Sequence, residues 1–401
     1  MSILLFTNCT NDIVNIDTDT DITETDNAVN FGIYLSDPVK SRADVDFTNI
    51  TTEILQKSDG FGVYGYYTED KEYINDVNRS PNFFNNEKVT YNSTSKIWEY
   101  SPVKYWSKSN THNFTFLSYA PYKANPTIQF INGDPYIKYS LLDGYDLLWG
   151  TDGGNISEID GIHSVHNIKP RSEKIKFLFK HALARIHGNN TDAKNHSGID
   201  IKYIVDDDAT YTINPKETTV YIKDLKIDIK DSSSVTNETG TYTGAIKAEW
   251  LNLYTGEWHC DSTGIESKAV NPKGIVKTYI ISDVAENLKD SVTNLEGKNG
   301  VTTVSQPLLK DNLITYMFPG TKPTFTVSIT YVIKTLDSKL KDGYSSIATT
   351  LTRDFKFTKE MKMNAQYKIN LILNLYTVKF DAEVDELTSD GNTQPVEVIN
   401  I

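Results

Sequence analysis

The fold class of this chain follows from the stretch Gly60-Phe61-Gly62-Val63-Tyr64-Gly65-Tyr66-Tyr67. Positions 61, 63 and 65 fall on one face, and this period of two is typical of a half-buried β-strand. The glycines indicate a close backbone approach or a bend. A second alternating run lies at 113–122, and the 24 tyrosines, with frequent Thr, Val, Ile and Phe, favour strands throughout. We therefore predict a mainly β protein.

Further short strands separated by turn residues predict β-sandwiches rather than a parallel sheet. Residues 82–90 and 96–100 read as a hairpin with a polar turn. Residues 175–187 begin as a strand and continue either as a strand with a bulge or as a short helix, and residues 284–300 predict a helix or a long loop. The other predicted strands are 29–35, 146–150, 219–229, 244–251, 276–281, 313–318, 324–333, 351–357, 367–375 and 378–384.

The length of 401 residues predicts more than one domain. The segment 151–172 is rich in Gly, His and Asp and ends near Lys169-Pro170, which makes it the best boundary. We predict a signal remnant and acidic tether at 1–27, one β-sandwich at 28–172 and a second at 173–401.

The N-terminus carries a candidate lipidation site at Cys9. An apolar run ends at this cysteine, and the polar, acidic stretch that follows is typical of the tether of a bacterial lipoprotein. A secretory signal also needs a basic segment before its apolar run, and none is present here. Two interpretations therefore stay open. Either the start codon is placed too late and Cys9 belongs to a lipoprotein signal, or Cys9 is an ordinary cysteine near a terminus.

Composition excludes several function classes. The net charge of −13 argues against a nucleic-acid partner, because no basic stripe is present to neutralise phosphates. The sequence contains no stretch of 18 apolar residues, so it does not predict a membrane-spanning helix. The histidines and Cys260 show no zinc-ligand spacing, and no nucleophile motif accompanies His181. We predict no metal, no cofactor and no enzymatic activity, with a structural role for His181.

In their order and spacing, several motifs make the chain resemble the fimbrillin-like (Mfa-like) lipoproteins of Bacteroides-type bacteria, the type V pilins. In the second half the match is looser. The matching stretches are Cys9, 29–35, Ser41-Arg42-Ala43, 60–66, 84–89, 98–106, 116–121, 146–149, 177–185, 316–320 and 378–384.

The resemblance implies two transthyretin-like β-sandwich domains in tandem on a lipoprotein exported to the outer membrane. It also implies that an Arg-specific maturation protease cuts between Arg42 and Ala43 and so removes the first strand. A lost strand leaves apolar side chains and unpaired backbone groups exposed, and the strand of an incoming subunit replaces both. The displaced strand would present Val29, Phe31, Ile33 and Leu35.

The function implied is a structural fimbrial subunit or a tip or adhesion component, in a homo- or heteropolymer with other fimbrial subunits. The candidate donor strand lies at the C-terminus, with Val396, Val398 and Asn400. Its apolar part is short and follows a polar tail, which fits a tip subunit that accepts a strand without donating one. The sequence does not indicate which host or bacterial surface ligand such a component binds.

Two other function classes stay open. A monomeric surface glycan-binding lipoprotein would use exposed aromatic residues, for which Trp98, Tyr105 and Trp106 are candidates, although such residues more often belong to a core. A hydrolase would need two carboxylates brought together in a cleft.

Overall fold

Alternating burial builds the long strands of this protein, whose structure is a computed structural model. In β21 (Pro323–Leu336) the side chains of Phe325, Val327 and Ile329 are buried, while the Thr and Ser residues between them are half-buried. Successive side chains of a strand point to opposite faces, so this pattern places one face of β21 on a core. The mainly β fold predicted from the sequence is confirmed.

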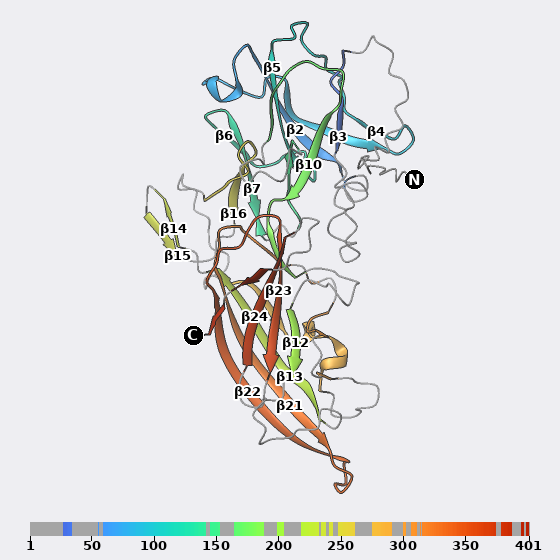
Figure 1. The fold of residues 1–401 in the computed structure, drawn as a ribbon, viewed down its shortest axis with the longest axis vertical. Helices are drawn as coiled ribbons and strands as arrows, with labels where there is room; N and C mark the ends of the chain where they lie inside the picture. The colour runs from blue at the N-terminus through green and yellow to red at the C-terminus, as the bar shows by residue number, and fades with distance from the viewer. Residues whose placement is uncertain are drawn as a thin grey trace, which may run out of the picture.

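The structure describes residues 27–33, 55, 59–141, 145–152, 164–187, 199–203, 218–231, 234–237, 240–243, 248–260, 275–290, 300–301, 306–310, 313, 315–373, 378–386, 394–396 and 398–400. These residues form an elongated molecule with an upper and a lower lobe (Figure 1).

The upper lobe holds two sheets. In order across the first are β1 (Phe31–Ile33), β10 (Ile175–His181), β8 (Leu148–Thr151), β5 (Asn113–Ala120), β2 (Phe61–Glu69), β3 (Phe84–Asn92) and β4 (Ile97–Glu99), with β9 (Val165–Ile168) paired to β5. In order across the second are β17 (Trp258–Cys260), β16 (Ala248–Asn252), β7 (Asp134–Ser140) and β6 (Ile128–Ile131). The predicted hairpin is confirmed, because β3 and β4 pair antiparallel.

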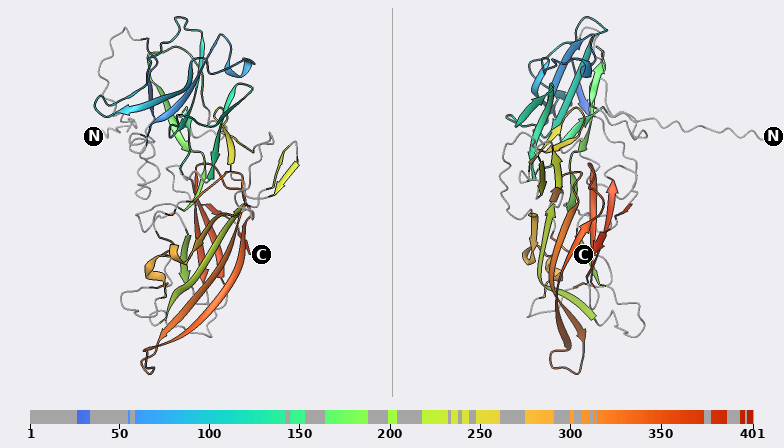
Figure 2. Two further views of the ribbon diagram at one scale, coloured as in Figure 1. Left: turned by 180° about the vertical axis from the view of Figure 1, so that it is seen from behind. Right: turned by 90° about the vertical axis from the view of Figure 1, so that its left-hand side faces the viewer.

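The lower lobe is a sandwich of two sheets around one apolar core. One sheet contains β18 (Ile275–Ile280), β13 (Thr218–Asp231), β21, β22 (Tyr344–Phe357) and β26 (Val398–Asn400). The other contains β19 (Gln306–Pro307), β12 (Ile199–Tyr203), β23 (Ala365–Leu373), β11 (Ala184–His187), β20 (Thr315–Met317), β24 (Val378–Glu386) and β25 (Gln394–Val396). A separate hairpin is formed by β14 (Ser234–Asn237) and β15 (Gly240–Thr243). Figure 2 shows the two lobes from other directions.

The eight-stranded sheet is covered on both faces, which corrects the prediction of a half-buried strand at 60–67. In β2, Phe61 and Val63 enter a phenylalanine-rich core, and Tyr64 and Tyr66 enter a tyrosine-rich core on the opposite face. Tyrosine reads as a surface residue in an alternating pattern, yet here the Tyr66 hydroxyl donates to the carbonyl of Gly133 and is buried. We call these two clusters the Phe core and the Tyr core.

The chain passes between lobes within the stretch 175–187, for which a bulged strand and a short helix were both predicted. β10 ends at His181 in the upper sheet and β11 begins at Ala184 in the lower one. The bend at Ala182 and Leu183 is buried. The domain boundary at 172 stays a prediction, and β16 and β17, which lie beyond it in sequence, pair with β7 of the upper lobe.

The helical elements with described bounds are single 3-10 turns, namely η2 (Tyr73–Asn75), η4 (Ile281–Asp283) and η5 (Glu286–Leu288). The last lies in the stretch 284–300, for which a helix or a long loop was predicted. Within the described part of the chain, no helix is long and apolar enough to cross a membrane.

Replacing Gly65 with alanine tests the close packing of β2 on β3. A Cβ atom at Gly65 would lie 2.5 Å from Cδ2 of Phe84, where a neighbour must shift. We expect Gly65→Ala to lower the free energy of unfolding by about 1–3 kcal/mol, measured by urea denaturation. The control is Gly32→Ala, whose Cβ would meet its nearest atom at an ordinary 3.5 Å. Equal losses in both variants would contradict the packing argument.

Candidate functional site: the N-terminal strand and its slot

The N-terminal strand is held in the upper lobe from two sides. On one side β1 pairs parallel with β10, and the amide of Ile175 donates to the carbonyl of Asn30 at 2.8 Å. On the other side the amide of Val29 donates to the carbonyl of Lys104 at 2.8 Å, and the amide of Trp106 donates to the carbonyl of Asn27 at 2.9 Å. The strand therefore lies between two backbone edges, and we call the space that it fills the β1 slot.

Phe31 anchors this strand in the Phe core. Its ring is 2% exposed. The ring stacks on Phe177 with centroids 6.0 Å apart and meets four other rings edge-on, those of Phe61, Phe84, Tyr100 and Phe116, at 5.3–6.4 Å. Such edge-to-face contacts add about 0.5–1.5 kcal/mol per pair beyond the area that they bury. One side chain of a three-residue strand thus occupies the centre of the core.

Alternation along the strand matches alternation in the slot. Val29 and Phe31 are buried and Ile33 packs at the margin of the same core, while Asn30 between them is only half-buried. The β1 slot therefore accepts apolar side chains at every second position, which is the pattern that a β-strand supplies.

Tyr100 adds a hydrogen bond to the backbone of the N-terminal strand. Its hydroxyl donates to the carbonyl of Val29 at 2.7 Å and accepts from the amide of Lys104 at 3.1 Å. Burial raises the pKa of the Tyr100 hydroxyl above its ordinary value. The hydroxyl consequently keeps its proton at neutral pH and serves as a donor to whichever strand fills the slot.

Several predicted site residues lie outside the described residues, namely Cys9, Leu35, Arg42 and Ala43. The lipidation and cleavage sites therefore remain predictions. Of the predicted displaced strand, Val29, Phe31 and Ile33 are described, and all three belong to or pack against the Phe core.

The structure does not bring the candidate donor strand to the slot. Val396 pairs with Ala382 of β24, and Val398 and Asn400 pair with residues of β22. The C-terminal segment thus adds one short strand to each sheet of the lower lobe, whereas β1 belongs to the upper lobe (Figure 1).

The aromatic residues considered for glycan binding have different environments. Trp106 is buried and packs against Phe114, Trp98 is half-buried beside the Phe core, and Tyr105 is 58% exposed. They do not form one exposed platform. Tyr105 lies in the segment that pairs with the N-terminal strand.

His181 has a carboxylate partner that the sequence did not indicate. Its Nδ1 is hydrogen-bonded to Oδ2 of Asp146, and its backbone amide donates to the Asn364 side chain at 3.1 Å. The pair sits where the chain leaves β10 for the lower lobe. The contact from the His181 backbone amide to Asn364 reaches the segment before β23 of the lower lobe, and the structural role of this histidine stays a prediction.

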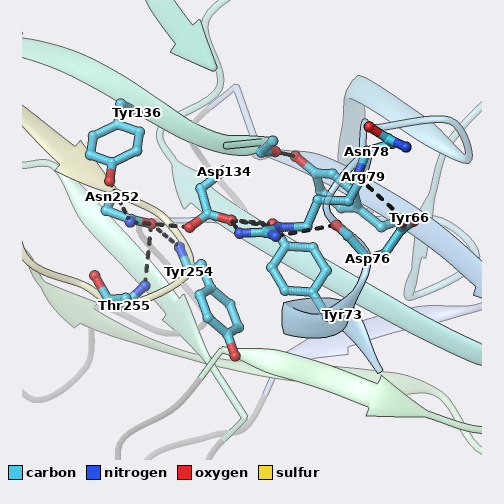
Figure 3. Close-up of polar contacts among 11 residues, drawn as sticks. Tyr66, Tyr73, Asp76, Asn78, Arg79, Asp134, Tyr136, Asn252, Tyr254 and Thr255 are labelled. Carbon is cyan, nitrogen blue, oxygen red and sulfur yellow. Dashed lines mark hydrogen bonds and ion pairs between the residues drawn. The ribbon is translucent and has the colours of Figure 1, made fainter. Parts of the chain in front are cut away.

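A buried polar network lies under the Tyr core (Figure 3). Arg79 donates two hydrogen bonds to Oδ1 of Asp134, at 3.0 and 2.8 Å, and the Tyr73 hydroxyl donates to the same oxygen at 2.8 Å. Asn252 donates to Tyr136 at 3.0 Å and to Asp134 at 3.5 Å. Because Asn252 belongs to β16, the network connects segments that are more than 100 residues apart.

The pKa values of Arg79 and Tyr73 in this network are both raised. Burial alone would lower the pKa of Arg79, but its hydrogen bonds and attraction to Asp134 outweigh burial and raise the pKa. Burial raises the pKa of Tyr73 far above its ordinary value. A charged guanidinium and a neutral phenol around one carboxylate form a satisfied structural site without a nucleophile. Among the described residues, no group of three or more His, Cys, Asp or Glu is placed to hold a metal ion.

A sequence model of one protein family, described as fimbrillin-like, matches residues 42–386. The crystal structure of a fimbrial protein from Bacteroides vulgatus ATCC 8482 is similar, with a TM-score of 0.56 and 19% identity, and covers 90% of this chain and 99% of that chain. A structure from Bacteroides uniformis ATCC 8492, assigned to cell adhesion, has a TM-score of 0.37 and 13% identity over 90% of this chain and 100% of that chain. A search of curated proteins found no match.

Truncating Phe31 tests its place in the core. We expect Phe31→Ala to lower the free energy of unfolding of the intact chain by about 3–5 kcal/mol, because the cavity is enclosed by five rings. The readout is urea denaturation. Phe130→Ala is the matched control, since that ring is 45% exposed and its loss should cost much less. A Phe31→Ala protein as stable as the control would show that β1 is dispensable to the core.

Removing the Asp134 carboxylate tests the buried network. Asp134→Ala leaves Arg79 charged and buried, and we expect a loss of about 3–5 kcal/mol in the free energy of unfolding. The control is Asp59→Ala, which breaks the exposed Lys88–Asp59 pair and should cost less than about 1 kcal/mol. Equal effects, again measured by urea denaturation, would refute the structural role of the network.

Proposed function

This chain belongs to the fimbrillin-like family, and we propose that it assembles into a fimbrium through exchange of the strand that occupies the β1 slot. The family consists of structural proteins, so the chain is a pilus subunit at the cell surface and not an enzyme. The exchange, the protease and the lipid anchor are parts of the proposal.

The single observation that carries the proposal is the position of Phe31. A strand that is integral to a sheet is normally fixed by many neighbours, yet β1 is short and lies at the end of its sheet. Its main-chain partners on both sides and the pocket of rings around Phe31 form a template for one extended segment. Such a template gives affinity through the backbone and register through alternate pockets.

Cleavage after Arg42 would turn an internal strand into a bound peptide. While the chain is intact, β1 is tethered and its effective concentration at the slot is in the millimolar range or above. After the cut, only non-covalent contacts hold β1 in the slot, and a strand that binds the slot more tightly can replace β1. An empty slot would expose an apolar cluster and unpaired backbone groups. The slot is therefore more stable with a strand bound than empty, both before and after the exchange.

A donor strand has to come from another subunit in this proposal. The candidate donor of this chain, at Val396, Val398 and Asn400, pairs with β24 and β22 in its own lower lobe. Because valine is smaller than phenylalanine, this segment would leave part of the Phe31 pocket empty. A partner subunit whose strand carries an aromatic residue at that position fits better, which favours a heteropolymer or a tip position.

Anchoring would follow from Cys9. A lipidated cysteine followed by the acidic tether would place the subunit on the outer membrane, and a stable anchor requires more than one acyl chain. Proteolytic removal of residues up to 42 would also detach the subunit from this anchor. One cut would thus release the protein from the membrane and free the slot.

Proteolysis of a protein that lacks residues 1–9 tests the proposal. We expect an Arg-specific protease to create a new N-terminus at Ala43, as seen by N-terminal sequencing, and to leave a slot that another subunit's strand can fill. SDS-resistant oligomers of this chain alone on gel electrophoresis would indicate that its own C-terminal strand can also fill the slot. Arg42→Ala should block both results, whereas Arg171→Ala should leave both unchanged. A terminus at Ala43 without oligomers would indicate a subunit that needs the donor strand of a partner.

Strand exchange would be refuted if the protease left the segment around Arg42 intact, or if the Arg42→Ala protein formed the same oligomers as the unmodified chain. In that case the monomeric, glycan-binding alternative would become the next hypothesis to test, by measuring whether soluble glycans bind.

A further inference from the structure

The outer edge of β22 is a second place where this protein offers backbone groups to another strand. β22 pairs with β21 along residues 344–356 without a register shift. On its other side, β26 pairs only with Phe355, Lys356 and Phe357. Among the described residues, no strand pairs with 344–354 on that side, so every second N–H and C=O there points outward.

The position of this edge leaves room for a partner. β22 runs along the margin of the lower lobe, and the end of the β21–β22 hairpin extends beyond the other sheet (Figures 1 and 2). Most side chains of 344–354 are exposed, and Ile347 is 63% exposed. Leu351 packs only in part against the lower core.

The edge lacks the features by which proteins normally prevent strand pairing. Residues 344–352 read Tyr-Ser-Ser-Ile-Ala-Thr-Thr-Leu-Thr, with no charge, proline or glycine. Proteins protect free edges with lysines, prolines, bulges or short strands. The opposite edge of the same sheet does so, because β18 is short, contains Lys277 and has an irregular register with β13. Uncharged segments of high β-propensity readily pair with copies of themselves.

The sequence of β22 is complementary to itself in one antiparallel register. With Thr349 of two copies opposite each other on a two-fold axis, Ile347 of each copy faces Leu351 of the other. In the same register Arg353 faces Ser345 and Asp354 faces Tyr344, so no like charges meet. A slip by one residue would place core-facing side chains opposite outward-facing ones. A slip by two residues would move Ile347 opposite Arg353 or Thr349.

We propose that β22 pairs with β22 of a second copy of this chain in this register, which joins the two five-stranded sheets into one continuous sheet. About ten backbone hydrogen bonds and two Ile–Leu pairs would hold the contact. The net charge of −13 on each copy opposes association, so the dimer should strengthen as salt screens that repulsion. The contact is separate from the β1 slot and does not depend on proteolysis.

Sedimentation velocity of the intact chain over a range of concentrations tests the pairing. We expect a reversible dimer whose dissociation constant falls as salt is raised from low to physiological concentration. Ile347→Lys should weaken the dimer at least tenfold, because two ammonium groups would meet the two leucines. Ile280→Lys is the matched control, an isoleucine that is 45% exposed on β18, and it should leave the dimer unchanged.

Cross-linking tests the register. In a chain carrying Cys9→Ser and Cys260→Ser, Thr349→Cys should form an intermolecular disulfide, since its two copies lie directly opposite each other. Thr352→Cys should not, because its copies would be six residues apart along the strands, roughly 20 Å. A chain that stays monomeric at all concentrations, a dimer weakened equally by Ile280→Lys, or equal cross-linking at both positions would overturn the proposal.

Discussion

The Phe core of the upper lobe depends on one inserted side chain, that of Phe31. Its ring contacts five others, and the strand that carries it is hydrogen-bonded on both sides. A strand of three residues at the end of a sheet forms few backbone hydrogen bonds. The Phe31 side chain therefore supplies most of the free energy that binds β1 to the upper lobe. The same arrangement that makes β1 important for stability also makes the slot specific, because an empty pocket of this shape favours any strand with a suitable ring.

The two faces of the upper sheet have different physical characters. Phe31 of β1 packs in the core on the Phe face, whereas side chains of β6, β7, β16 and β17 pack in the core on the Tyr face, close to the Arg79–Asp134 ion pair. Breaking a buried ion pair is costly, and Asn252 links this one to a distant part of the chain. Loss of β1 would therefore disturb one face of the sheet while the satisfied network on the other face keeps its strands in place.

Sequence patterns predicted many of the strands and the β3–β4 hairpin, but not β6, β7, β9 or β12. The set Val29, Phe31 and Ile33, which the family resemblance implied, belongs to or packs against the Phe core. Alternation in the sequence missed the burial of both faces of β2, since a tyrosine is compatible with a surface position or with a core in which its hydroxyl is hydrogen-bonded. It also missed the His181–Asp146 and Arg79–Asp134 pairs. These partners lie 35 and 55 residues apart. Local patterns carry no information about which distant polar groups meet, because the topology of the sheets decides that.

The C-terminal segment bears differently on the two proposed assembly sites. β26 covers the edge of β22 only at 355–357, and its companion β25 pairs with β24. The pairing proposed for β22 uses residues 344–354, which β26 leaves uncovered, so this contact does not require the C-terminal segment to move. At the β1 slot the same segment would leave part of the Phe31 pocket empty, so it can stay in its own lower lobe while the strand of a partner fills the slot. The two contacts therefore use separate surfaces of the subunit, and one can form without the other.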